Sequence, residues 1–178
     1  MKVLIVKLSA IGDVVHTIPF LRTLKLNFPH WEIDWVLEDV TYPLLRGNPL
    51  LRRVIELKRR SWVKGRDLKG FPGFLKALRE VNYDLVIDLQ GLLKSGIITF
   101  LSRGEQKIGL SISKELSYLF YRKVIEVDIE RHALIRTLDV AKALGARLLS
   151  KDASIFLEPM ERRVYEGLLS SMGLRQKE

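Results

Sequence analysis

The sequence predicts an α/β fold, a Rossmann-like parallel sheet with helices on both faces. Three observations support this prediction. Short apolar runs with strand composition alternate with helical segments at least five times along the chain. One of these runs, residues 85–89, is apolar except for Asp88, as is typical of a strand buried on both faces. The first strand is followed by a tight loop and then a helix, and repetition of this unit requires a parallel sheet with right-handed crossovers.

Apolar runs and periodic segments place the elements along the chain. The expected strands are residues 3–6, 31–37, 54–57, 85–89, 107–110 and 124–127, with 154–157 as a further candidate. The expected helices are residues 14–24, 40–46, 71–81, 92–101, 115–121, 134–144 and 159–172, and Gly145 is a good C-cap for the sixth of these. We predict one domain over residues 1–158, followed by a terminal helix and an interdomain linker region over 159–178.

Composition limits the class of protein. A chain of 178 residues is long enough for one domain with a proper core. An apolar content of 47% and a charged content of 29% are typical of a soluble globular protein. There is no cysteine, which excludes disulfides and thiolate metal sites. The first apolar run is far too short for a signal peptide or a membrane span, so we expect a cytoplasmic protein.

The charge is concentrated in one segment. The chain has a net charge of +9, and residues 52–79 hold ten Lys and Arg against Glu56 and Asp67, which is +8. A local basic field predicts an anionic partner, such as a phosphorylated lipid, an anionic membrane or a nucleic acid. A solvated charged surface is the alternative. Trp62 among these cations also suits nucleic acid, but the sequence has no RNP motif, KH loop or zinc pattern.

Asp13 comes after the loop that leaves the first strand. Ligands bind outside the carboxyl ends of the strands in an open α/β sheet, so Asp13 is expected to face the binding crevice near a helix N-terminus. Two interpretations stay open, because Asp is a preferred N-cap residue and also a possible general base. The glycines of a dinucleotide-binding fingerprint are absent and no G-K-[ST] follows, so the segment is neither that fingerprint nor a P-loop.

Polar residues from several loops are expected at the same edge of the sheet. Gly91 permits a tight turn or the close approach of a ligand, and Gln90 and Lys94 can hydrogen-bond sugar hydroxyls or acidic groups. Asp88 either takes part in the site or orients the loop backbone. One carboxylate would thus face a wall of cations, which suits an anionic acceptor and deprotonation of one of its hydroxyls. The other polar residues that come after the strands are Lys7, Ser9, Gly12, Lys58, Arg59, Arg60, Trp62, Lys64, Arg66, Ser95, Ser111, Ser113 and Lys114.

The three histidines do not form a metal site. His16 lies close to Asp13 and is either a helix-face residue or a neighbour of the site, whereas His30 lies in a turn and is expected at the surface. His132 and Arg136 have i, i+4 spacing near a helix start. A structural role is favoured for His132, because no nucleophile is nearby. No His/Asp/Glu cluster has metal-ligand spacing, so we predict neither a metal nor a cofactor.

Two stretches resemble a known family. The opening KLSAIGDVVHTIPFLRTLK and the later NYDLVIDLQGLLKSG are similar to the ADP-heptose:lipopolysaccharide heptosyltransferases, glycosyltransferase family 9. They most resemble the members that add the first heptose of the inner core. The resemblance runs through most of the chain and weakens over residues 38–53 and after Leu149. It implies the GT-B arrangement of two Rossmann-like domains, of which this chain would be the N-terminal, acceptor-binding half, with the C-terminal donor domain absent from this sequence.

The resemblance also implies an activity. The intact enzyme would transfer a heptose from ADP-L-glycero-D-manno-heptose to the Kdo of Kdo–lipid A in lipopolysaccharide inner-core biosynthesis. Transfer would invert the anomeric centre, with Asp13 as the general base. The ADP-heptose donor would bind mainly through the absent domain, so this chain alone is expected to be inactive. The alternative is a basic α/β module that binds nucleic acid or another anionic partner without catalysis.

The family's acceptor is a lipid, which bears on location and binding residues. We expect a peripheral position on the cytoplasmic face of the inner membrane of a Gram-negative bacterium, where anionic headgroups attract the basic segment, and no nucleic acid as a partner. Arg122 precedes a strand, so simple geometry puts it at the opposite edge of the sheet, and only the resemblance makes it a candidate. The residues proposed to bind the acceptor are Lys7, Ser9, Gly12, Arg59, Arg60, Trp62, Lys64, Gln90, Gly91, Lys94 and Arg122.

Overall fold

The computed structural model describes residues 1–58, 70–156, 162, 163 and 166. In these residues six strands form one sheet in the order β3-β2-β1-β4-β5-β6, and every neighbouring pair is parallel. This order is that of a Rossmann fold, so the predicted fold class is confirmed. The strands are β1 (Lys2–Val6), β2 (Glu32–Glu38), β3 (Arg53–Leu57), β4 (Tyr83–Asp88), β5 (Gly104–Leu110) and β6 (Lys123–Ile125).

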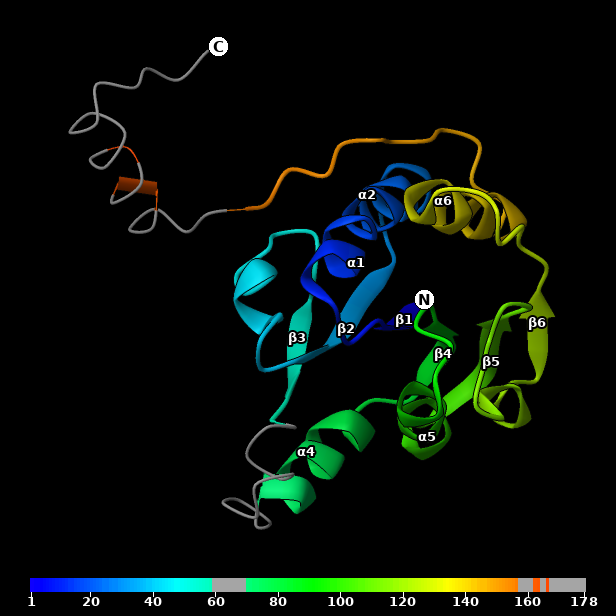
Figure 1. Ribbon diagram of the computed structural model, residues 1–178. Coiled ribbons are helices and arrows are strands. Elements are labelled where there is room, and N and C mark those ends of the chain that lie inside the picture. Colours follow the sequence, from blue (N-terminus) through cyan, green and yellow to red (C-terminus); the bar gives the residue numbers. More distant parts are fainter. Residues whose placement is uncertain (59–69, 157–161, 164–165, 167–178) are drawn as a thin grey trace.

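Helices cover both faces of the sheet (Figure 1). One face carries α1 (Ile11–Val15), α2 (Ile18–Asn27) and α6 (Ala133–Ala143), and the other carries α4 (Gly70–Arg79) and α5 (Leu93–Leu101). Two short 3-10 helices, η1 (Tyr42–Leu44) and η2 (Ser117–Phe120), lie within the short helices predicted over residues 40–46 and 115–121. The described helices therefore occur in the predicted order, with shorter and tighter turns in two loops.

The sheet separates two apolar cores. Val3 and Ile5 of β1 point to the side of α2 and α6, whereas Leu4 and Val6 point to the side of α4 and α5. All four are fully buried. This alternation follows from the two-residue period of a strand, and burial on both faces explains why the central strands are almost continuously apolar.

The first predicted helix, residues 14–24, is two helices in the structure. Pro19 stands in the first turn of α2, where its missing N–H costs nothing. In a continuous helix it would have left the carbonyl of Val15 without a partner and clashed with it. At the break the Thr17 hydroxyl donates to the Asp13 carbonyl over 2.8 Å. The chain therefore turns at residues 16 and 17, directly beside Asp13.

The predicted last strand, residues 154–157, is wrong for the part that the structure describes. Residues 148–156 form no strand and run along α2, where Arg22 donates to the Ser154 carbonyl and Asn27 donates to the Leu148 carbonyl. The apolar residues Ile155 and Phe156 are 39% and 37% exposed. Side-chain hydrogen bonds from α2 therefore hold this segment in place of sheet pairing. The predicted terminal helix falls almost entirely outside the described residues.

Candidate functional site

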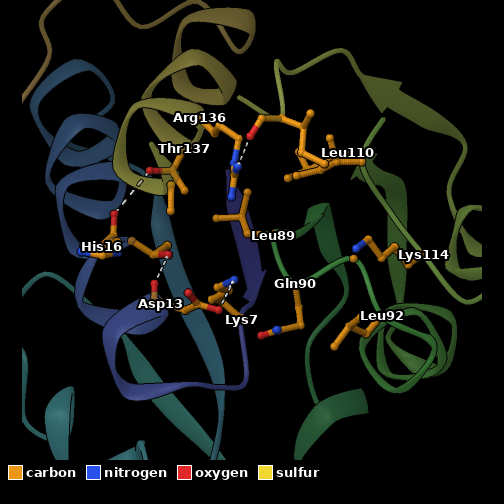
Figure 2. A pocket seen from close by; sticks show the side chains of 15 residues that line it. Lys7, Asp13, His16, Leu89, Gln90, Leu92, Leu110, Lys114, Arg136 and Thr137 are labelled. Atoms are coloured by element: carbon orange, nitrogen blue, oxygen red, sulfur yellow. Dashed lines mark hydrogen bonds and ion pairs between the residues drawn. The ribbon is translucent and has the colours of Figure 1, made fainter. Parts of the chain in front are cut away.

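A cavity of about 270 Å³ opens at the carboxyl edge of the sheet, where β1 and β4 lie side by side. The strand order reverses between these two strands, and such a switch point is where open α/β sheets bind ligands. Figure 2 shows side chains from both halves of the sheet converging on this space. The residues that line the cavity are Lys7, Asp13, His16, Thr17, Leu89, Gln90, Gly91, Leu92, Leu110, Ile112, Lys114, Ile129, Ala133, Arg136 and Thr137.

Asp13 presents its carboxylate to the cavity. It is the third residue of α1, and Ala10 is the N-cap, so the N-cap interpretation of Asp13 is wrong. Lys7 Nζ donates to the Asp13 carboxylate over 3.3 Å, and 46% of the Asp13 side chain stays exposed. A carboxylate in this position is open to a ligand on one side and held by a cation on the other.

Lys7 is the cation that sits at the floor of the site. It comes directly after the last residue of β1, and its side chain is only 12% exposed. Burial lowers the pKa of Lys7, and the nearby carboxylates of Asp13 and Asp88 oppose that shift. The Lys7 carbonyl accepts a hydrogen bond from the indole of Trp35 over 3.0 Å, which fixes the backbone here. Lys7 is therefore a positioned group beside the exposed carboxylate.

Asp88 orients the loop after β4. Its fully buried carboxylate accepts hydrogen bonds from the backbone N–H of Gln90 and Gly91, at 2.9 and 3.0 Å, and from the Tyr121 hydroxyl at 2.8 Å. Burial raises the pKa of Asp88, although these hydrogen bonds oppose the shift. Of the two interpretations of Asp88, the structure supports the loop-orienting one.

Gln90 and Gly91 join that loop to its neighbours. The Gln90 side-chain oxygen accepts from the backbone N–H of Leu8 and Ser9, both over 3.2 Å, and so ties the loops after β1 and β4 together. Gly91 has a φ of +69°, and a Cβ there would lie 2.9 Å from the Ser113 hydroxyl. The predicted tight turn at Gly91 is confirmed, and both residues line the cavity.

Lys94 and Ser9 meet at the same edge, beside the cavity. Lys94 Nζ donates to Glu38 over 2.7 Å and to the Ser9 hydroxyl over 3.1 Å. Glu38 is buried at the end of β2. The cluster therefore joins the loop after β1, the end of β2 and the start of α5, and Lys94 is held by a carboxylate that the sequence did not single out.

Arg136 and Lys114 complete the cationic lining. Arg136 lies in the first turns of α6, and its guanidinium donates to the carbonyls of Ile129 and Arg131 over 2.7 and 3.1 Å. Figure 2 shows it reaching into the cavity from α6, with Lys114 on the other side. The sequence offered a signal for Arg136 as a site residue, because it lies soon after the carboxyl end of a predicted strand.

Two histidines connect α1 to α6. The rings of His16 and His132 meet edge-on with centroids 4.8 Å apart. His132 Nδ1 accepts from the Leu134 N–H and caps α6, which agrees with the structural role predicted for it. The Thr137 hydroxyl donates to the His16 carbonyl over 3.4 Å. His16 is thus a neighbour of the site that also helps to fix its wall.

The remaining candidates lie elsewhere or outside the described residues. Gly12 is in α1 with open space where a Cβ would stand. Arg122 starts the approach to β6, donates its backbone N–H to the Lys107 carbonyl and does not line the cavity, as simple geometry predicted. Four candidates in the basic loop lie outside the described residues, namely Arg59, Arg60, Trp62 and Lys64.

Some cations of the basic segment, residues 52–79, are paired with carboxylates, so the number of Lys and Arg overstates the charge available to a partner. Arg52 and Arg53 both pair with the buried carboxylate of Asp34, and Arg53 also pairs with Glu80 over 2.6 Å. Two of its ten cations therefore fasten β3 to β2 and α4. In the described ranges, no group of three or more His, Asp and Glu side chains is placed to hold a metal ion. None of the helices described there is long and apolar enough to cross a membrane.

The strand order and the polar cavity at its switch point define a Rossmann-like ligand-binding domain, and comparisons with known proteins give its family. Residues 73–158 match the model of glycosyltransferase family 9 (heptosyltransferase). The chain is 38% identical to lipopolysaccharide heptosyltransferase 1 of Pseudomonas aeruginosa, over 77% of this chain and 41% of that protein. It is 37% identical to lipopolysaccharide heptosyltransferase 1 of Escherichia coli K12, over 82% of this chain and 48% of that protein.

A comparison with solved structures gives the same family. The chain superimposes on the E. coli heptosyltransferase WaaC with ADP-2-deoxy-2-fluoro heptose with a TM-score of 0.78 and 30% identity, over 98% of this chain and 67% of that one. The chain belongs to glycosyltransferase family 9, the heptosyltransferases. It spans about half the length of the curated relatives it matches.

Proposed function

We propose that this chain is the acceptor-binding half of an inverting heptosyltransferase. The activity would be transfer of a heptose from ADP-L-glycero-D-manno-heptose to the Kdo of Kdo–lipid A in the inner core of lipopolysaccharide. The observation that supports it best is the half-exposed carboxylate of Asp13 in a cavity also lined by Lys7, Lys114 and Arg136. Kdo is a sugar acid, so cations suit its carboxylate while Asp13 faces one of its hydroxyls.

Asp13 would act as general base. It removes the proton from a Kdo hydroxyl as that oxygen forms a bond to the anomeric carbon of the heptose. The bond from that carbon to the diphosphate breaks, and ADP departs with the electron pair. Attack from the face opposite the leaving group inverts the anomeric centre. The Lys7 ammonium, 3.3 Å from the carboxylate, keeps the Asp13 side chain oriented before the proton arrives.

The other residues would bind and position the acceptor. Arg136 is oriented by two backbone carbonyls, which leaves its guanidinium directed at the cavity for a planar anion. Gln90 holds the loops after β1 and β4 together, so the distance between Asp13 and the opposite wall is fixed. The ADP-heptose donor would be held mainly by a second domain, and this chain alone would bind acceptor weakly and turn over little.

The proposal is tested by heptose transfer from ADP-heptose to Kdo–lipid A. The chain would be assayed alone and after fusion to the donor domain of a homologous heptosyltransferase. We expect transfer by the fusion, with inversion at the anomeric carbon, and little or none by the chain alone. A fusion that folds and binds ADP-heptose but transfers nothing to this acceptor contradicts the proposal. Steeply salt-dependent binding of oligonucleotides in its place would favour the nucleic-acid alternative.

The lipid acceptor would place the protein at the cytoplasmic face of the inner membrane of a Gram-negative bacterium. Cations near the surface of an anionic bilayer are each worth about 1 kcal/mol of attraction. Fractionation of cells that carry the tagged chain tests this location. Release from membranes by high salt would agree with peripheral attachment, and recovery in the soluble fraction at low salt would contradict it.

A further inference from the structure

An exposed apolar face lies over α5 and η2, on the side of the sheet that carries α4 and α5. Leu93, Ile97 and Phe100 have spacings of four and three residues, so they form one stripe along the outside of α5. Leu116 and Leu119 are three residues apart, the repeat of a 3-10 helix. The α5–η2 face consists of the exposed side chains of Leu93, Ile97, Phe100, Leu116, Tyr118 and Leu119.

The two ridges of this face, one on α5 and one on η2, form a single packed unit. A Cβ at Gly96 of α5 would lie 2.6 Å from the Phe120 ring and 3.1 Å from Ser117, so the glycine allows η2 to pack directly on α5. The rings of Phe100 and Phe120 lie 5.7 Å apart between centroids. The Leu93 N–H donates to the Glu115 carboxylate over 3.1 Å and joins the ridges at one end. The exposed apolar side chains are therefore held on a fixed base.

Charge around the face is positive. Residues 93–124 hold six Lys and Arg against two Glu. Lys107 Nζ lies 5.5 Å from the centre of the Phe100 ring. The Arg122 backbone N–H donates to the Lys107 carbonyl over 2.8 Å, so these two cationic residues lie side by side. Burial, and then the charge of Arg122, lower the pKa of Lys107. Within the described residues neither of them forms an ion pair. An apolar patch with cations beside it complements a surface that offers both hydrocarbon and negative charge.

The face also continues from the cavity. Leu92 and Lys114 line the cavity, and the α5–η2 face begins one residue after Leu92 and two after Lys114. A lipid whose sugar occupies the cavity therefore has a short path to this face. We propose that the α5–η2 face docks on an anionic phospholipid bilayer, its apolar side chains entering the headgroup region and Lys107 and Arg122 meeting lipid phosphates. The choice of a bilayer rests on the proposed function, whose acceptor is a lipid.

The test is flotation of the whole chain with vesicles of phosphatidylethanolamine and phosphatidylglycerol. Leu119→Gln and Phe100→Gln each remove an exposed apolar group without a change in net charge, so attraction by the basic segment is unaltered. Each substitution should weaken partition by about tenfold, the value for one large apolar side chain leaving the interface. Leu26→Gln on α2, where Leu26 is 57% exposed against 66% for Leu119, should stay within about twofold of the wild type.

Two results of the flotation experiment overturn the proposal. One is wild-type partition by both variants with unchanged thermal unfolding, and the other is no binding of the wild type to anionic vesicles. Sedimentation velocity shows whether the face joins two copies of this chain. A dimer that is lost in Leu119→Gln would assign the α5–η2 face to self-association and would also overturn the proposal. Heptose transfer by the fusion protein to a deacylated, water-soluble acceptor distinguishes failure of this proposal from failure of the proposed function. That reaction needs the catalytic site but no bilayer.

Discussion

Two carboxylates stand at the ends of neighbouring strands, Asp13 in the first turn after β1 and Asp88 at the end of β4. They share one edge of the sheet, and both were candidates by sequence. Asp88 is fully buried, and its oxygens are occupied by two backbone N–H groups and a tyrosine hydroxyl. Asp13 meets one lysine at 3.3 Å and leaves 46% of its side chain exposed. The Asp88 carboxylate therefore holds a loop together, whereas the Asp13 carboxylate is available to a ligand.

The difference arises from the path of the backbone after each strand. After β4 the chain makes a tight turn at Gly91, which brings two N–H groups onto Asp88. After β1 the chain enters a five-residue helix whose break at Thr17 leaves the Asp13 side chain on an open surface. A polar residue at the same edge therefore acquires a structural or a chemical role through the backbone groups around it.

The largest expected effect on folding is at Asp88. Asp88→Ala leaves two buried N–H groups and the Tyr121 hydroxyl without their acceptor, which should lower the free energy of unfolding by about 3 kcal/mol. Asp13→Ala removes one partly exposed ion pair and should cost about 1 kcal/mol or less. Urea denaturation of both variants measures the two values. Equal losses would mean that the two carboxylates do not differ in their structural roles.

A similar contrast applies to the first glycine after each of these two strands, Gly12 after β1 and Gly91 after β4. Gly91→Ala forces a side chain into a left-handed conformation with its Cβ 2.9 Å from the Ser113 hydroxyl, at a cost of about 2 kcal/mol. Gly12→Ala lies in α1 with nothing within 4 Å of the new Cβ and should be neutral or stabilising. Thermal unfolding compares them. A Gly91→Ala variant as stable as the wild type would show that the loop after β4 is not locked.

A substitution at Arg136 tests whether the open side of the site binds an anion. In the fusion with a donor domain, Arg136→Gln should raise the KM for the Kdo-bearing acceptor by about tenfold, equivalent to about 1.4 kcal/mol of binding, and change kcat less. Arg103→Gln, an exposed arginine outside the cavity lining, is the matched control and should leave KM unchanged. Equal KM values for the wild type and Arg136→Gln would remove Arg136 from the acceptor site.

The smallest expected effect is in the pH dependence of stability. Burial raises the pKa of Asp88 above its usual 3.8, so the folded state binds this proton more tightly than the unfolded state. The resulting stabilisation is complete below pH 3.8 and is lost as the pH rises through the raised pKa. The wild type should therefore lose stability relative to Asp88→Asn, which does not titrate, as the pH increases above 3.8. A difference that grows in favour of the wild type over that range would have the wrong sign.

The sequence predicted the sheet and the edge that carries the site, because burial on both faces imposes a pattern that short strands show clearly. It also placed Lys7, Asp13, Gln90 and Gly91 correctly at the cavity. It did not resolve the roles of Asp13 and Asp88, since these depend on where backbone N–H groups point after each strand. The Lys94–Glu38 pair joins residues 56 positions apart and has no local pattern.

Other features of the structure were not predicted from the sequence, for different reasons. The apolar run at residues 154–157 has strand composition, yet its described part is held by Arg22 and no strand forms there. The helical spacing of Arg136 indicates only a local pairing with His132, although its position after a predicted strand is also a signal for the site. The sequence count of the basic segment includes Arg52 and Arg53, which in the structure pair with the buried carboxylate of Asp34. Composition alone does not reveal which charges find buried partners.

The most direct test of the account compares Asp13→Asn with Asp88→Asn in the same fusion, by kcat for heptose transfer and by thermal unfolding. Both substitutions replace a carboxyl group by an amide and keep the side-chain shape. We predict that Asp13→Asn lowers kcat by about 10²- to 10⁴-fold with little change in unfolding temperature, as loss of a general base requires. Asp88→Asn should retain kcat within about fivefold. A folded Asp13→Asn variant with wild-type kcat would contradict the assignment of Asp13 as the base.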